Sequence, residues 1–108
     1  MQIEVTDNTA ARRYEAAADG RLAGFIDYRV RDGRTSLIHT QVEDDFEGKG
    51  VASTLVKRAL GMVRDSGLEL LPLCPFVQAH MQRHPEFSDL VPVEERRRFG
   101  LSETARRG

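Results

Sequence analysis

The sequence predicts one α/β domain built on a mixed, mostly antiparallel sheet with a central crossover helix. Four strand-like segments joined by short turns fill the N-terminal half of the 108 residues, a length typical of one domain with a single core. An amphipathic segment follows a glycine-rich loop, and another strand-like segment follows that one. A strand, a helix and a strand in this order form a crossover unit whose two strands run parallel.

The four N-terminal strands are predicted from alternating apolar and polar residues, the pattern of a half-buried strand. They span residues 2–6, 12–18, 21–31 and 34–42. In the third strand the apolar residues fall mostly on one face, namely Leu22, Ile26, Tyr28 and Val30. Asp19-Gly20 and Asp32-Gly33 favour tight hairpins, so an antiparallel meander is expected. Gly24, inside the third strand, predicts a bulge or a close backbone contact.

The long helix is predicted over residues 51–65, where apolar residues recur at helical spacing and form one stripe. That stripe consists of Val51, Ala52, Leu55, Val56, Ala59, Leu60 and Val63. Ser66-Gly67 is expected to stop the helix, because glycine suits the left-handed conformation that often follows a last helical turn.

The C-terminal part is predicted as a short strand over residues 68–74 and a short helix over 76–84, with a turn or a last short strand over 86–91. These segments complete a single domain over residues 1–91. From residue 92 the composition becomes strongly polar, so residues 92–108 are expected to form a polar, basic tail or helix.

Composition narrows the classes of function. Lys plus Arg is 16 and Asp plus Glu is 17, and this near balance argues against a general nucleic-acid binder. The single cysteine excludes an intrachain disulfide, and the N-terminus lacks the pattern of a secretory signal, so a reducing, cytoplasmic setting is expected. No apolar run approaches the roughly 18–20 residues that cross a bilayer, so no membrane association is expected. Oligomeric state is not predicted.

The glycine-rich loop Glu47-Gly48-Lys49-Gly50-Val51-Ala52 directly precedes the long helix. Glycine allows a sharp turn and leaves no Cβ to block a ligand. The first helical turn offers unpaired N–H groups and a partial positive charge, which together suit a phosphate or pyrophosphate. The loop lacks the Gly-Lys-Ser/Thr ending of a Walker A motif and the third glycine of a dinucleotide fold. A purely structural turn is the alternative.

The loop resembles the acyl-CoA motif Q/R-x-x-G-x-G/A of the Gcn5-related N-acetyltransferase superfamily, with Glu47 where Gln or Arg is usual. Across residues 2–91 the chain looks like the small single-domain branch called YjdJ-type acetyltransferase-like proteins. The segments that carry this resemblance are His39-Thr40-x-Val42, Gly48-Lys49-Gly50-Val51-Ala52, Leu73-Cys74-Pro75-Phe76-Val77 and Arg83-His84-Pro85-Glu86. The resemblance implies a Gcn5-related fold and transfer of an acetyl group from acetyl-CoA to an amine of a small molecule or a protein.

The resemblance also implies where coenzyme A binds. The backbone of residues 48–53 would hold its pyrophosphate. The strand around residues 39–42 would diverge from the strand at 68–74, with pantetheine in the gap. The cofactor-binding residues implied in this way are Val42, Gly48, Lys49, Gly50, Val51, Ala52, Ser53, Cys74, Arg83 and His84.

Cys74 and His39 are the candidates for chemistry. A cysteine acts as a nucleophile in its thiolate form, and the resemblance implies a role for Cys74 in acyl transfer. The alternative is a small buried residue. A neutral imidazole at His39 suits removal of a proton from an amine, directly or through water. The alternative is a hydrogen-bonded strand histidine. Direct attack by the amine is the expected mechanism, and a cysteine relay competes with it.

Two further features of the sequence bear on other functions, a pair of histidines and a basic C-terminal segment. His80 and His84 share one helical face, but two histidines do not make a metal site, and no metal is expected. The basic residues Arg96-Arg97-Arg98 and Arg106-Arg107 suit a solvated segment or contact with an acidic partner. The main alternative function is a CoA-binding or acyl-CoA-binding module with little or no catalysis, and a weaker one is a protein-interaction domain.

Overall fold

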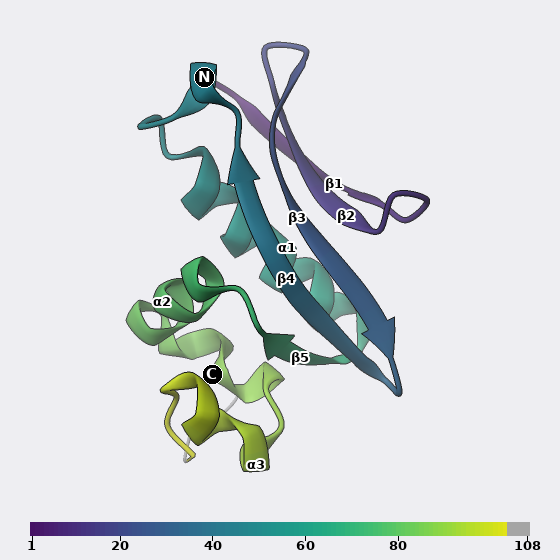
Figure 1. Cartoon of the computed structure of the whole chain (residues 1–108), viewed down its shortest axis with the longest axis vertical. Helices are drawn as coiled ribbons and strands as arrows, with labels where there is room; N and C mark the ends of the chain where they lie inside the picture. The colour runs from purple at the N-terminus through teal and green to yellow at the C-terminus, as the bar shows by residue number, and fades with distance from the viewer. Residues whose placement is uncertain (104–108) are drawn as a thin grey trace.

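The computed structural model describes residues 1–103 and contains one five-stranded sheet with a long helix across one face (Figure 1). The strands are β1 (Ile3–Asn8), β2 (Arg13–Ala18), β3 (Arg21–Arg31), β4 (Arg34–Val42) and β5 (Glu69–Pro72). They lie side by side in chain order. The first four pair antiparallel, and β5 pairs parallel with β4. The predicted fold class is therefore confirmed.

The helices are α1 (Val51–Ser66), α2 (Pro75–Arg83) and α3 (Val93–Arg96). Shorter 3₁₀ turns are η1 (Asp44–Phe46), η2 (Pro85–Leu90) and η3 (Arg97–Phe99). Figure 1 shows α1 crossing the sheet, while α2 and α3 lie together beside β5. Among residues 1–103 no helix is both long and apolar enough to cross a membrane.

The sheet contains two bulges that decide which side chains face α1. Between β2 and β3, Ala16 pairs with Gly24 and Ala17 pairs with Leu22, so Ala23 is an extra residue and is fully buried. Leu22 is consequently 37% exposed instead of buried with Ile26. A Cβ on Gly24 would lie 2.8 Å from the backbone oxygen of Gln41 on β4, so this glycine marks both a bulge and a close backbone approach.

The second bulge lies in β4. Asp27 pairs with His39 and Tyr28 pairs with Leu37, which leaves Ile38 without a partner on β3. Such an extra residue interrupts the alternation of a strand. Leu37 is buried, whereas Ile38 and His39 are both exposed, and beyond them Thr40 and Val42 are half-buried.

The core forms where α1 packs against the sheet. The helix buries one stripe, consisting of Val51, Leu55, Val56, Ala59, Leu60 and Val63. The sheet face opposite carries small residues such as Ala16, Ala18 and Ala23, which let the helix approach closely, together with Ile26 and Leu37. Gly67 ends the helix in the left-handed conformation, and its N–H donates to the Arg64 carbonyl at 3.2 Å, as predicted.

The C-terminal segment continues this core. Residues 86–91, predicted as a turn or short strand, belong mostly to η2, which Arg64 of α1 holds through two 2.8 Å bonds to the Asp89 carboxylate. Past residue 91, Phe99 and Leu101 are buried in the same cluster, and buried Arg96 donates to the Val91 carbonyl at 2.9 Å. The part of the predicted polar tail up to residue 103 therefore folds against the domain; Arg106 and Arg107 lie outside the described residues.

Candidate functional site

The edge of β4 is open next to the glycine-rich loop. Strand β5 pairs with β4 only as far as Leu37 and Pro72, and Pro72 has no N–H to continue the ladder. The N–H of Cys74 then donates to the Leu37 carbonyl at 2.9 Å. Beyond this bond, β4 runs on to Val42, and none of the strands within residues 1–103 pairs with it on that side (Figure 1).

The first turn of α1 opens onto this region. Gly50 precedes the helix with a φ of 76°, a left-handed conformation that strongly favours glycine. The N–H of Thr54 donates to the Gly50 carbonyl, so the N–H groups of Val51, Ala52 and Ser53 have no acceptor within the helix. These N–H groups and the positive end of the helix dipole suit an anion.

A pocket of about 260 Å³ lies at this helix end. Its lining joins the end of β4, the loop, the first turn of α1 and the start of α2: Val42, Phe46, Glu47, Gly48, Gly50, Val51, Ala52, Ser53 and Phe76. Seven of the nine come from residues 46–53 and Val42 precedes them closely in the chain, so one continuous segment builds most of the pocket. Phe76 closes it from α2.

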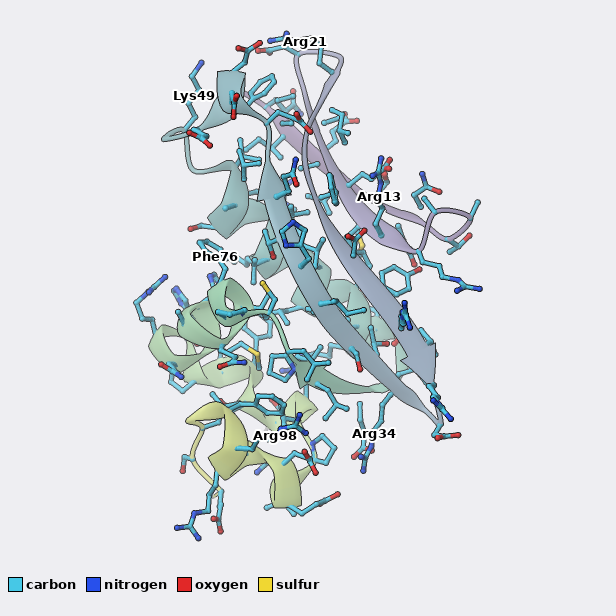
Figure 2. All side chains as sticks on the ribbon, in the orientation of Figure 1. Arg13, Arg21, Arg34, Lys49, Phe76 and Arg98 are labelled. Atoms are coloured by element: carbon cyan, nitrogen blue, oxygen red, sulfur yellow. The ribbon has the colours of Figure 1, made fainter. Side chains whose placement is uncertain are left out.

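The charged residues of the loop are placed differently from each other. Glu47 lines the pocket, whereas Lys49 does not. The Lys49 ammonium lies 5.9 Å from the centre of the Phe46 ring, and in Figure 2 its side chain extends from the loop away from Phe76. Lys49 is exposed, so it remains available to a charged group outside the pocket.

Cys74 lies between β4 and α2 and is only 4% exposed. Its Sγ is 3.3 Å from the Thr40 Oγ1, and either group can donate the hydrogen bond. The residue also precedes α2 directly, and its carbonyl accepts the N–H of Gln78 at 3.0 Å. The thiol is therefore fixed at the place where β4 and β5 part.

His39 lies on the opposite face of β4 from this thiol. Its ring is exposed, packs edge-on to Phe25 at 6.4 Å, and places Nε2 3.4 Å from the Gln41 Oε1. The structure therefore brings Thr40, and not His39, into contact with Cys74. His39 faces the surface that α1 does not cover.

Arg83 and His84 lie at the far end of α2 from Phe76, about 12 Å along the helix axis at 1.5 Å per residue. Both are exposed, and neither lines the pocket. The pocket thus includes six of the ten residues expected to contact the cofactor, and Cys74 lies nearby on β4. Lys49 is adjacent in the loop, whereas Arg83 and His84 are separate.

His80 is a buried histidine whose two ring nitrogens find no hydrogen-bond partner in the described structure. Burial lowers its pKa, and the electrostatic effect of His84, whose ring centre lies 4.3 Å away, lowers it further. Within residues 1–103 no group of three or more His, Cys, Asp or Glu side chains is arranged to hold a metal ion.

Two residues of the site were missed by sequence reasoning. The sequence pattern places Phe76 only in a short helix, yet this residue lines the pocket. Sequence reasoning does not single out Thr40 for chemistry, yet its hydroxyl contacts the thiol. Residues two apart in a strand share a face, so Thr40 lies on the same face as Val42, an expected cofactor contact. This alternation is the sequence signal that identifies Thr40.

Comparison with known proteins gives three results. Residues 13–90 match the family described as GCN5-related N-acetyl-transferase. The chain is 28% identical over 86 residues to Protein NATD1 of Xenopus tropicalis, covering 77% of this chain and 78% of that one. The fold is similar to a GCN5-like protein of Staphylococcus aureus solved by NMR, with a TM-score of 0.62 at 21% identity over 82% of this chain and 87% of that one.

A larger structure shares part of the fold. The ribosomal-protein-S18-alanine N-acetyltransferase of Escherichia coli aligns with 55% of this chain, with a TM-score of 0.50 at 19% identity. This chain covers 40% of that enzyme's length.

Proposed function

Because the chain belongs to the GCN5-related N-acetyltransferase family, we propose that it transfers the acetyl group of acetyl-CoA to an amine. Members of this family are acyltransferases, and the proposal adds the donor and the class of acceptor. One observation supports it most strongly. Three first-turn N–H groups of α1 face a pocket at the open edge of β4, where a pyrophosphate and an extended chain could both be accommodated.

Each part of the site then has a role. The N–H groups of Val51, Ala52 and Ser53 bind the pyrophosphate. The unpaired backbone groups of β4 after Leu37 can hydrogen-bond to an extended amide chain, as exposed strand edges do. Thr40 and Cys74 lie where this edge meets α2, close to where an acyl group carried on such a chain would end.

Acetyl-CoA supplies a thioester. In the reaction a C–N bond from the acceptor amine to the acetyl carbon replaces the C–S bond, and the sulfur leaves as the thiol of coenzyme A. The chain's contribution is to position the amine and to remove its protons. His39 is exposed on β4, on the face that α1 does not cover, and is the candidate base. In the competing relay, the Cys74 thiolate takes the acetyl group first and the amine takes it in a second step.

Binding can be tested by thermal unfolding with coenzyme A and acetyl-CoA. A ligand at 100 times its Kd should stabilise the protein by about 2.7 kcal/mol, which corresponds to roughly 10 °C or more for a domain of this size. Pantetheine, which lacks the pyrophosphate, is the matched control and should give a smaller shift. If millimolar coenzyme A and acetyl-CoA both leave the melting temperature unchanged, the proposal is wrong.

Turnover separates the proposal from a binding module. Release of free thiol from acetyl-CoA should depend on an added amine, which can be screened across small amines and peptides. A protein that binds coenzyme A tightly but turns over no amine would favour the module without catalysis.

A further inference from the structure

A second pocket, of about 710 Å³, lies on the side of the sheet opposite α1. Its volume falls within the roughly 300–1,000 Å³ typical of small-molecule sites. Its lining includes Ser36 and Ile38 of β4, which alternate with the buried Thr35 and Leu37 and so face away from the helix. The end of β3, the loop between β1 and β2, and Leu73 complete it.

The charge of this pocket is unusual for a chain with a net charge of −1. Arg12, Arg29 and Arg31 line it, and no carboxylate from the described part of the chain does so. Within residues 1–103 neither Arg12 nor Arg29 forms an ion pair, and Arg31 has only a 3.8 Å pair with Asp32 in which both side chains are about 90% exposed. Such an exposed pair contributes little, so the arginines remain available to an anionic ligand.

The position of Arg12 is fixed by its backbone. Its N–H donates to the Thr9 carbonyl at 3.3 Å, and its carbonyl accepts the N–H of Tyr28 at 2.9 Å. The loop between β1 and β2 is therefore attached to β3, directly before Arg29. The guanidinium groups come from two segments held together by this bond, and a planar guanidinium binds a carboxylate or phosphate with two parallel hydrogen bonds.

The pocket adjoins the site proposed for acyl transfer. Two of its lining residues, Ile38 and Leu73, directly precede His39 and Cys74 in the chain. The hydrogen bond from the Cys74 N–H to the Leu37 carbonyl holds these two segments side by side. Ile38 and Leu73 are each 38% exposed and form an apolar surface there. The β4 bulge places Ile38 and His39 on one face.

The distance between the two regions is set by β4. Arg29 pairs with Ser36, and Ser36 is three residues before His39. Ile38 is the bulge residue, so β3 has only two steps from Arg29 to Asp27, the partner of His39. At about 3.3 Å per residue, the arginines therefore begin about 7–10 Å from His39, with the apolar surface between them. A ligand that reaches both ends needs an anionic group, an apolar chain and an amine, in that order.

We propose that this pocket binds the acceptor, and that the acceptor is a small amine joined by an apolar chain of about 7–10 Å to a carboxylate or phosphate. This inference rests on the proposed acetyl transfer. It predicts that α-amino acids, whose amine and carboxylate are adjacent, and polyamines, which carry no anion, are poor acceptors.

The test is calorimetric binding of 8-aminooctanoate, whose extended chain spans about that distance. Heptylamine, the same chain without the carboxylate, is the matched ligand control, and 6-aminohexyl phosphate tests the other anion. Titrations are run on the protein alone and with saturating coenzyme A. We expect at least one of the two anionic amines to bind at least about tenfold more tightly than heptylamine, as a charge-assisted contact implies, and the stronger of them identifies the anion.

Variants assign the preference to the pocket. Arg12→Gln and Arg29→Gln, singly and combined, should remove it, while Lys57→Gln, which deletes an exposed charge on α1, should retain it. Equal binding of heptylamine and both anionic amines to the wild type, or an unchanged preference in the double variant, would overturn this inference. Failure of coenzyme A to bind in the same titrations would instead count against the proposed function, since the preference is also measured without it.

Discussion

Replacing Ser53 by glutamate should raise the stability of the protein and weaken its binding of coenzyme A. Ser53 is the third residue of α1, is exposed and lines the pocket. An acidic side chain in a first helical turn interacts favourably with the helix dipole, by about 0.3–1 kcal/mol. The same carboxylate would lie beside the pyrophosphate proposed to bind there, so the two effects have opposite signs.

The size of the binding loss follows from Coulomb's law. Two like charges about 6 Å apart repel by about 1.4 kcal/mol at an effective dielectric constant of roughly 40. Two phosphate charges give about 2–3 kcal/mol, and partial screening at this exposed position leaves a loss of about ten- to a hundredfold in affinity. The loss should shrink as salt is raised from about 0.05 to 0.5 M, because the screening length falls.

The assay combines urea unfolding with calorimetric titration of coenzyme A for the wild type, Ser53→Glu and Ser53→Gln. Glutamine has the same shape without the charge, so it reports steric effects alone and should bind almost like the wild type. Equal losses in both variants would mean that the side chain blocks the ligand. Unchanged affinity in a folded Ser53→Glu variant would refute the placement of the pyrophosphate at this helix end.

Three further predictions concern the fold and the chemistry. Gly24→Ala should destabilise the protein by about 1–3 kcal/mol in urea unfolding, because the new Cβ would lie 2.8 Å from the Gln41 backbone oxygen. Gly61→Ala on α1 should stabilise it by about 0.5–1 kcal/mol in the same titration, because no described atom outside the neighbouring helix backbone lies within 4 Å of the new Cβ. A Gly24→Ala variant of unchanged stability would contradict the close approach. Burial, followed by Asp7, raises the pKa of Tyr14 to about 12, and burial and the bond from the Tyr28 hydroxyl to Asp7 raise the pKa of Tyr28 as well. Both pKa values lie above the unfolded value of about 10, so the stabilisation of the folded protein is complete below pH 10. It is lost as pH rises toward 12, by up to about 1.4 kcal/mol per pH unit for each tyrosine. Tyr14→Phe should reduce this dependence of stability on pH, and a tyrosinate absorbance midpoint near 10 in the folded protein would disprove the raised pKa values. If the amine attacks acetyl-CoA directly, Cys74→Ala should retain acetyl transfer, and mass spectrometry should find no acetyl group on the wild-type chain. An acetylated Cys74 in the wild type together with an inactive Cys74→Ala variant would establish the relay instead.

Local patterns were sufficient to predict most of the fold. The two Asp-Gly turns and the apolar alternation fixed the meander, and helical spacing identified α1 with its glycine end. The errors came from the bulges, which depend on pairing with a neighbouring strand. Leu22 is exposed because Ala23 takes the inward position. Val30 is a separate case: it keeps the alternation of Ile26 and Tyr28 but lies one residue before the end of β3, beside the hairpin, and is 55% exposed.

The same limitation applies to the candidate site. Alternation from buried Leu37 puts His39 inside with Cys74, but the extra residue Ile38 turns His39 outward and brings Thr40 in. The loop pocket was predictable because one continuous segment builds most of it. The arginine pocket was not, since it gathers residues from the loop after β1, from β3 and β4, and from Leu73, which only the folded sheet brings together.

The bulge at Ile38 also adds one residue to β4 without changing which side chains on either side of it pair with β3. With Ile38 removed, Leu37 and His39 would be neighbours, β4 would pair regularly with β3, and simple alternation would keep His39 outward and Thr40 inward. A deletion of one codon would thus leave Thr40 facing the thiol and would remove one apolar side chain from the arginine pocket, while the hairpin before the bulge and the glycine loop after it keep their sequences. Comparisons among related chains should therefore align the two halves of β4 separately, on either side of this residue.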